Sequence, residues 1–103
     1  MIIVNTDFIT GKELETIGLV KGSTIQSKNI GKDLGQCFKS IVGGELKSYT
    51  KMMNEARDLA TDRMIEDAQN MGADAVINVR YSSSAVMQSA AEIIVYGTAV
   101  KFL

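Results

Sequence analysis

The sequence predicts an α+β fold, a two-layer sandwich of a mostly antiparallel sheet with helices on one face. A long helical pattern ends at Gly72, and a strand pattern begins at Asp74. Alternating, β-branched segments lie before and after this helix, in the predicted order β-β-α-α-β-β. We expect the 103 residues to form a single domain, residues 1–103, in which the helix folds back over these strands.

Two strands are predicted in the N-terminal part. Residues 2–4 form a short apolar strand followed by a polar turn. Residues 13–28 alternate and are rich in threonine and β-branched side chains, which favours a longer strand. Within it, Gly18 and Gly22 indicate a bulge, a bend or a close approach of another backbone.

Two predicted helices follow. Apolar residues at helical spacing between Ile30 and Ile41 mark the first helix, which ends at Gly43 and Gly44. The second opens at Glu45 and ends at Gly72. Its inner stripe consists of Tyr49, Met53, Ala56, Ala60, Met64, Ala68 and Met71, widened by Met52, Leu59 and Ile65. The small alanines would let this helix lie close to the sheet.

Two further strands complete the sheet. In residues 74–82 one face is predicted to carry Ala75, Ile77, Val79 and Tyr81, and the serines at 82–84 are predicted to form a turn. Residues 90–102 are apolar on both faces, and such a strand has to be covered on both sides. Because one layer of helices covers a single face, we infer that a neighbouring copy of the chain covers the other.

The composition argues against several classes of function. Eleven basic and 12 acidic residues give a net charge of −1, which provides no long-range attraction to nucleic acid or to an anionic membrane. The single cysteine, Cys37, cannot form an intrachain disulfide, which fits a reducing cytosol. No signal-peptide or membrane-spanning pattern is found. We therefore expect a cytoplasmic protein without nucleic-acid or membrane partners.

The side chains needed for catalysis or for soft-metal binding are scarce. The chain has no histidine, so the serines at 82–84 lack a base, and no enzyme is expected. Soft metals prefer several thiolate, thioether or imidazole ligands. Cys37 lies on the apolar face of a predicted helix, and Met53, Met64 and Met71 lie on the core stripe. No catalytic residue, metal ligand or cofactor is assigned.

Two sets of polar residues are candidate sites. Arg57, Asn78 and Arg80 are candidate ligand contacts, since the Asn78–Arg80 pair could bind a carboxylate or phosphate in an intersubunit crevice or face water at its rim. Glu45, Tyr49 and Arg57 lie near one helical face. Arg57 could then reach Asp74, or Glu45 of a neighbouring copy. A ligand site and an interface salt bridge both remain open, with the interface favoured.

A family resemblance runs through the chain in order. It is carried by residues 29–35, 42–50, 55–57, 63–64, 71–76, 79–81 and 96–100. On these segments the chain resembles the bacterial YbjQ-like family. The resemblance implies a small α+β domain similar to a dodecin subunit, assembly into a ring of five copies, and a heavy-metal-binding label on an uncharacterised family. We expect a homo-oligomeric small-ligand or ion-binding module, with a heavy-metal-binding protein or a non-catalytic structural or partner-binding ring as alternatives.

Overall fold

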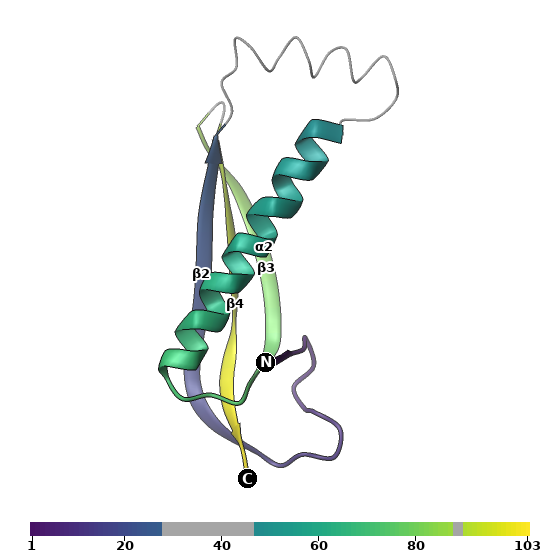
Figure 1. Cartoon of the computed structure of the whole chain (residues 1–103), viewed down its shortest axis with the longest axis vertical. Coiled ribbons are helices and arrows are strands. Elements are labelled where there is room, and N and C mark those ends of the chain that lie inside the picture. Colours follow the sequence, from purple (N-terminus) through teal and green to yellow (C-terminus); the bar gives the residue numbers. More distant parts are fainter. Residues whose placement is uncertain (28–46, 88–89) are drawn as a thin grey trace.

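The computed structural model describes residues 1–27, 47–87 and 90–103 (Figure 1). Their elements are β1 (Ile2–Ile3), β2 (Leu14–Ser27), α2 (Lys47–Asn70), β3 (Ala75–Met87) and β4 (Ala90–Phe102). The strands form one sheet in the order β1-β3-β4-β2. β1 pairs with β3 in parallel, and the other two pairs are antiparallel. The predicted α+β class is confirmed, while the predicted helix at residues 30–41 lies outside the described residues.

α2 packs against one face of the sheet through a stripe of small and flexible side chains. Ala56, Ala60, Met64 and Ala68 are fully buried in the main hydrophobic core. The predicted stripe was too wide, because Leu59 and Met71 are 39% and 38% exposed. The narrow alanine-rich contact leaves the flanks of the helix in solvent.

The end of α2 follows the glycine signal in the sequence. Gly72 has a φ of +76°, a conformation that costs glycine little. The amide of Ala73 donates to the carbonyl of Ala68 at 3.0 Å, and the amide of Gly72 donates to that of Gln69 at 3.0 Å. These two bonds form a Schellman cap, so the prediction that Gly72 ends the helix is confirmed.

The two glycines of β2 have different roles. The pairing with β4 shifts register between Thr16 and Gly18, which is a β-bulge. Gly22 lies against α2, where an added Cβ would collide with the carbonyl oxygen of Ala60 and the amide nitrogen of Met64. The predicted bulge and the predicted close approach of another backbone are both confirmed.

β3 differs from the prediction in two ways. Its pairing with β4 shifts register between Ile77 and Arg80, around Asn78, which has a φ of +54°. The bulge reverses the alternation, so Val79 packs in the main core whereas Ala75 and Ile77 lie in a second cluster. The prediction that these three residues share a face with Tyr81 was therefore wrong.

The serine cluster was also misassigned. Ser82, Ser83 and Ser84 are paired along β3 with Ile94, Ile93 and Glu92 of β4, so they are strand residues and not a turn. Cross-strand pairing along a long partner holds this segment extended in spite of its turn-like composition.

The sheet face opposite α2, which we call the far face, is covered over only part of its length. At the C-terminal end of β4, Val100 is fully buried together with Ala75 and Ile77. Val4, Ile9, Leu14 and Phe102 of the same chain pack against them. The premise that a neighbouring copy alone could cover this face was therefore wrong at this end, because the segment between β1 and β2 passes over it.

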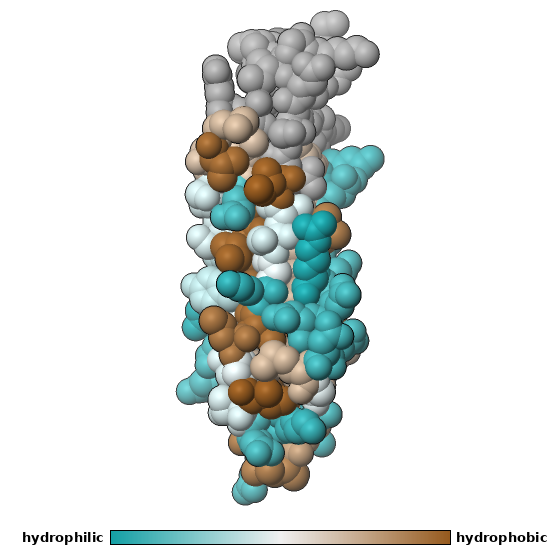
Figure 2. Space-filling model, turned by 90° about the vertical axis from the view of Figure 1, so that its left-hand side faces the viewer, coloured by the Kyte–Doolittle hydropathy of each residue, from teal (hydrophilic) through white to brown (hydrophobic). Residues whose placement is uncertain are grey.

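Farther along the far face the apolar side chains are open. Leu19 and Ile25 of β2 are 68% and 62% exposed, and Tyr96 of β4 is 40% exposed. Val20 and Val95 are buried beneath α2, so alternation along each strand places these three neighbours on the opposite face. Figure 2, viewed from the β2 side, shows brown atoms spread along the molecule between pale and teal ones, with a predominantly teal flank on the right where α2 lies.

The described helix is strongly charged, and no helix in residues 1–27, 47–87 and 90–103 has the length and hydropathy needed to cross a bilayer.

Candidate functional site

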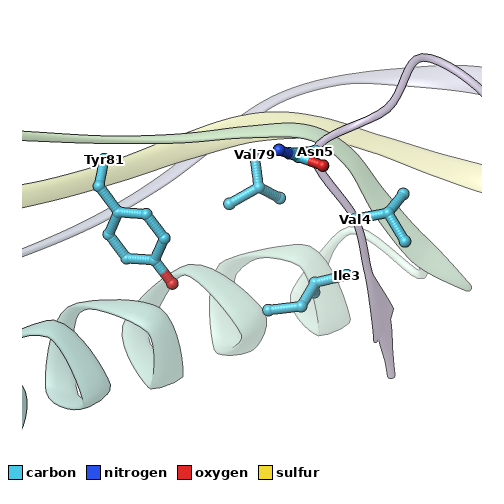
Figure 3. A pocket seen from close by; sticks show the side chains of 5 residues that line it. All are labelled: Ile3, Val4, Asn5, Val79 and Tyr81. Atoms are coloured by element: carbon cyan, nitrogen blue, oxygen red, sulfur yellow. The ribbon is translucent and has the colours of Figure 1, made fainter.

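A groove runs between α2 and β3. α2 lies mainly over β2 and β4 and crosses β3 only briefly. Two pockets open along the groove. The Ile3 pocket has a volume of about 290 Å³ and is lined by Ile3, Val4, Asn5, Val79 and Tyr81 (Figure 3). The Arg57 pocket has a volume of about 100 Å³ and is lined by Arg57, Tyr81, Ser82, Ser83 and Ile93.

Tyr81 is the wall between the two pockets. Its ring extends from β3 toward α2 (Figure 3), and its hydroxyl oxygen lies 2.8 Å from Oγ1 of Thr61. The Thr61 hydroxyl donates to the carbonyl of Arg57 at 2.7 Å. A threonine hydroxyl has one hydrogen, so the Tyr81 hydroxyl is the donor to Thr61. This bond links the helix to the strand. It uses the single hydrogen of the Tyr81 hydroxyl.

The remaining polar groups of the Arg57 pocket are suited to an anion. Arg57 carries a permanent positive charge and five N–H donors, and Ser83, on the α2 side of β3, adds a hydroxyl. Nη1 of Arg57 donates to Oδ1 of Asn54 at 2.9 Å, which orients the guanidinium. No carboxylate is among the lining residues, and Ile93 supplies an apolar wall. The pocket has room for about three water molecules at roughly 30 Å³ each, the size of a small oxyanion.

The Ile3 pocket is larger than the Arg57 pocket, but its lining is mostly apolar. Ile3 and Val79 point into the space below β3, whereas Val4 points away toward the far face (Figure 3). Asn5 and the Tyr81 hydroxyl are the polar lining groups. The pocket therefore offers apolar contact and little specific chemistry.

Asn78 and Arg80 hold the N-terminal segment and line neither pocket. The amide of Asn78 donates to the carbonyl of Thr6 at 2.9 Å. Nη1 of Arg80 donates to the carbonyl of Asn5 at 3.0 Å and to that of Val79 at 3.1 Å. Of the three residues proposed from the sequence as ligand contacts, Arg57 lines one of these two pockets, and neither pocket brings it together with Asn78 or Arg80.

The predicted polar network is not assembled within one described chain. Oδ2 of Asp74 accepts a hydrogen bond from the amide of Phe102 at 2.9 Å, beyond the C-terminal end of α2. Arg57 lies about 20 Å of helix before that end, and its described partner is Asn54. Tyr49 is in α2, but its side chain, like the whole of Glu45, lies outside the described residues.

The acidic side chains of the described residues do not form a three-ligand donor set for a metal ion. Within residues 1–27, 47–87 and 90–103, no three His, Cys, Asp or Glu side chains come close enough to hold one. Cys37 lies outside this part of the chain. The described part of one chain therefore offers no three-ligand set of these four residue types.

Thr61, Tyr81, Ser82 and Ser83 were not predicted as site residues. Thr61 lies four residues after Arg57 and so shares its helical face, which is a signal present in the sequence. The serines were not recognised as site residues because their composition is typical of a turn. The contact of Tyr81 depends on the packing of the helix over the sheet, which alternation does not specify.

Comparisons with known proteins agree on the family and the fold. A family model described as "Putative heavy-metal-binding" matches residues 1–103. A UPF0145 protein of Clostridium novyi is 71% identical over the full length of both chains. A UPF0145 protein of Methanosarcina acetivorans is 58% identical, covering 100% of this chain and 98% of the relative. A protein of unknown function of the DUF74 family from Pediococcus pentosaceus has a similar fold, with a TM-score of 0.70 at 13% identity, covering 100% of this chain and 98% of that one.

Proposed function

Because the chain belongs to the uncharacterised YbjQ-like family of UPF0145 proteins, we propose that it is a homo-oligomeric binding module that holds a small oxyanion in the Arg57 pocket. The ligand class is a carboxylate or phosphate group. The proposed role includes no catalytic step, and its proposed location is the cytoplasm.

The composition of the Arg57 pocket supports this proposal. The Arg57 guanidinium and the Ser83 hydroxyl line a space of about 100 Å³, and no carboxylate is among its described lining residues. A guanidinium binds a carboxylate or phosphate through two parallel N–H···O bonds. Asn54 orients the Arg57 guanidinium before any ligand arrives, which lowers the entropic cost of binding.

Calorimetric titration with inorganic phosphate and with acetate tests the binding. We expect saturable binding that Arg57→Gln weakens about tenfold or more, the loss of one charge-assisted contact. Lys51→Gln is the matched control, since it removes a positive charge from the same helix outside the pocket. An equal loss of phosphate affinity in both variants would indicate nonspecific charge attraction and would contradict the proposed site.

We also propose that the copies associate, as a ring of five. The support is the far face, where Leu19, Ile25 and Tyr96 are exposed to solvent in a single chain. Large apolar side chains left exposed along one face favour an interaction surface there. Sedimentation velocity should give a single species of about five copies, and a monomer at micromolar concentration would remove this part of the proposal.

A heavy-metal-binding protein is the second candidate, favoured by the description of the family model that matches the chain. Titration with zinc, copper(I) and cadmium tests it, with Cys37→Ser removing the one thiol. Tight binding that this variant abolishes would support the metal over the oxyanion. A chain that binds neither class would instead be a structural or partner-binding ring.

A further inference from the structure

The two flanks of α2 meet the sheet differently. On one flank, Nη1 of Arg63 donates to the carbonyl of Ser23 at 2.6 Å. On the same flank, Oδ2 of Asp67 accepts from the amide of Lys21 at 3.4 Å. These bonds close the helix onto the outward side of β2, the β2 edge of the sheet. The other flank borders the groove with its two pockets, so the groove is the open side of the helix–sheet contact.

The floor of the groove is a row of alternate β3 residues that changes from apolar to polar. Val79 packs in the main core, and Ser83 is paired with Ile93 of the same core. Tyr81 lies between them and bonds Thr61 of α2. All three β3 side chains therefore lie on the α2 face. At about 3.3 Å per residue, Val79 and Ser83 are about 13 Å apart, and this one floor joins the two pockets.

The helical wall of the groove changes in the same direction. Arg57, Thr61 and Ile65 follow one another at intervals of four residues, so they occupy the same flank of α2. α2 runs antiparallel to β3, and Arg57 lines the pocket that contains Ser83. The half-buried Ile65 is therefore two turns farther along, in the direction of the Ile3 pocket. The cation and the aliphatic side chain of the wall match the polar and apolar ends of the floor.

Tyr81 is the junction of the two pockets and lines both of them. Its hydroxyl is held by Thr61, and the residue is still 50% exposed. A ring that is fixed at its tip and open to solvent offers an apolar surface to a chain that passes over it (Figure 3). The apolar end beyond it is the larger one, at about 290 Å³ against about 100 Å³. The groove thus has a small cationic end, an aromatic middle and a large apolar end.

We infer that the groove binds an amphipathic anion, an aliphatic carboxylate whose head group pairs with Arg57 and whose chain crosses Tyr81 into the Ile3 pocket. The inference rests on the proposed oxyanion site and names its ligand class. A carboxylate carries one negative charge, which the single guanidinium among the lining residues balances, whereas a phosphate monoester carries nearly two. An aliphatic chain would cover the apolar end that a bare oxyanion leaves in water, and each methylene group so buried strengthens binding about fourfold.

Calorimetric titration of the full chain with acetate, octanoate and octanol tests the ligand class. Acetate shares the head group of octanoate, and octanol shares its chain. We expect octanoate to bind at least about tenfold more tightly than either of them. In Arg57→Gln, octanoate and octanol should bind with affinities within about twofold of each other, because the charged contact is lost.

The outcomes separate this inference from the proposed oxyanion site. Octanoate that binds no more tightly than acetate would overturn the inference and leave the oxyanion site in place. Octanol that matches octanoate in the unaltered chain would also overturn it, since the head group would then make no contact. A chain that binds neither acetate nor octanoate would overturn both.

A larger side chain in the Ile3 pocket tests where the aliphatic chain lies. Ile3→Phe should weaken octanoate binding at least about fourfold, the loss of one buried methylene group, and leave acetate binding unchanged. Ile2→Phe is the matched control in the same strand, because Ile2 is 46% exposed and does not line the pocket. Octanoate affinity that is equal in the two variants would overturn the assignment of the chain to this pocket.

A measurement on the unaltered chain covers the case in which Ile3→Phe fails to fold. In an NMR titration, octanoate should shift the backbone amides of Ile3 and Val79 as well as those of Arg57 and Ser83. Acetate should shift the amides of Arg57 and Ser83 and leave the other two in place. Octanoate shifts confined to the Arg57 pocket would overturn the inference.

Discussion

Gly22 of β2 lies directly beneath Ala60 of α2, so closely that a side chain at Gly22 would collide with the Ala60 carbonyl oxygen. The backbone of the helix therefore rests on the backbone of the strand. This contact holds α2 over the β2 side of the sheet and leaves a groove on the β3 side. The position of the Arg57 pocket follows from this missing Cβ.

Replacing Gly22 with alanine should strongly destabilise the fold. The added methyl group meets backbone atoms of Ala60 and Met64, which cannot move without displacing the helix. We expect a loss of at least about 2 kcal/mol in the free energy of unfolding, measured by urea denaturation. Gly18→Ala is the matched control in the same strand, because its Cβ would meet only Cε of Met71, at 3.3 Å. Equal losses in the two variants would mean that strand flexibility, and not helix contact, determines the cost.

The bulge at Asn78 should depend on its left-handed backbone. Glycine adopts a φ of +54° without strain, whereas a β-branched residue does not. Asn78→Gly should therefore leave the free energy of unfolding within about 0.5 kcal/mol. Asn78→Val should lower it by about 1–2 kcal/mol. A valine variant as stable as the glycine variant would show that the bulge can move along β3.

Tyr81 should contribute to the stability of the groove and not to anion affinity. Its hydroxyl hydrogen is donated to Thr61, so it is not available to a ligand. Tyr81→Phe should lower the free energy of unfolding by about 1 kcal/mol and leave the phosphate dissociation constant unchanged. Affinity that falls as much in Tyr81→Phe as in Arg57→Gln would place the hydroxyl on the ligand and contradict this assignment.

Removing both charged groups from the β2 edge should make the chain associate further. In the double variant Arg63→Met with Asp67→Asn, the carbonyl of Ser23 loses its donor, and the acceptor of the Lys21 amide loses its charge. We expect larger species that increase with concentration in sedimentation velocity. Lys51→Met with Asp58→Asn makes the same change of charge on α2 away from the edge and should leave the assembly unaltered. An unchanged assembly in both double variants would show that Arg63 and Asp67 do not prevent other strands from pairing with β2.

Much of the fold could be predicted because its signals are local. The predicted strand at residues 90–102 has the bounds of β4, and that at residues 13–28 begins one residue before β2, with residue 28 outside the described residues. The roles of Gly18, Gly22 and Gly72 also followed from the sequence, since each reflects a steric property that only glycine has.

The site was less predictable because it depends on contacts between distant segments. The extra residue at Asn78 reverses the alternation of β3, and nothing in the periodicity marks it. The serines of β3 were interpreted as a turn because their extended conformation comes from pairing with β4. Arg57 was identified as a candidate, but its neighbours in the pocket come from a strand 24 or more residues away in the sequence.

The most direct test of the proposed oxyanion site is an NMR titration, in which phosphate is added to the isotope-labelled full chain and the chemical shifts of the backbone amides are measured. Saturable shifts should be concentrated at Arg57, Ser82 and Ser83, with one shared dissociation constant, and should vanish in Arg57→Gln. Shifts spread evenly over the basic surface, or centred on residues away from this pocket, would contradict it.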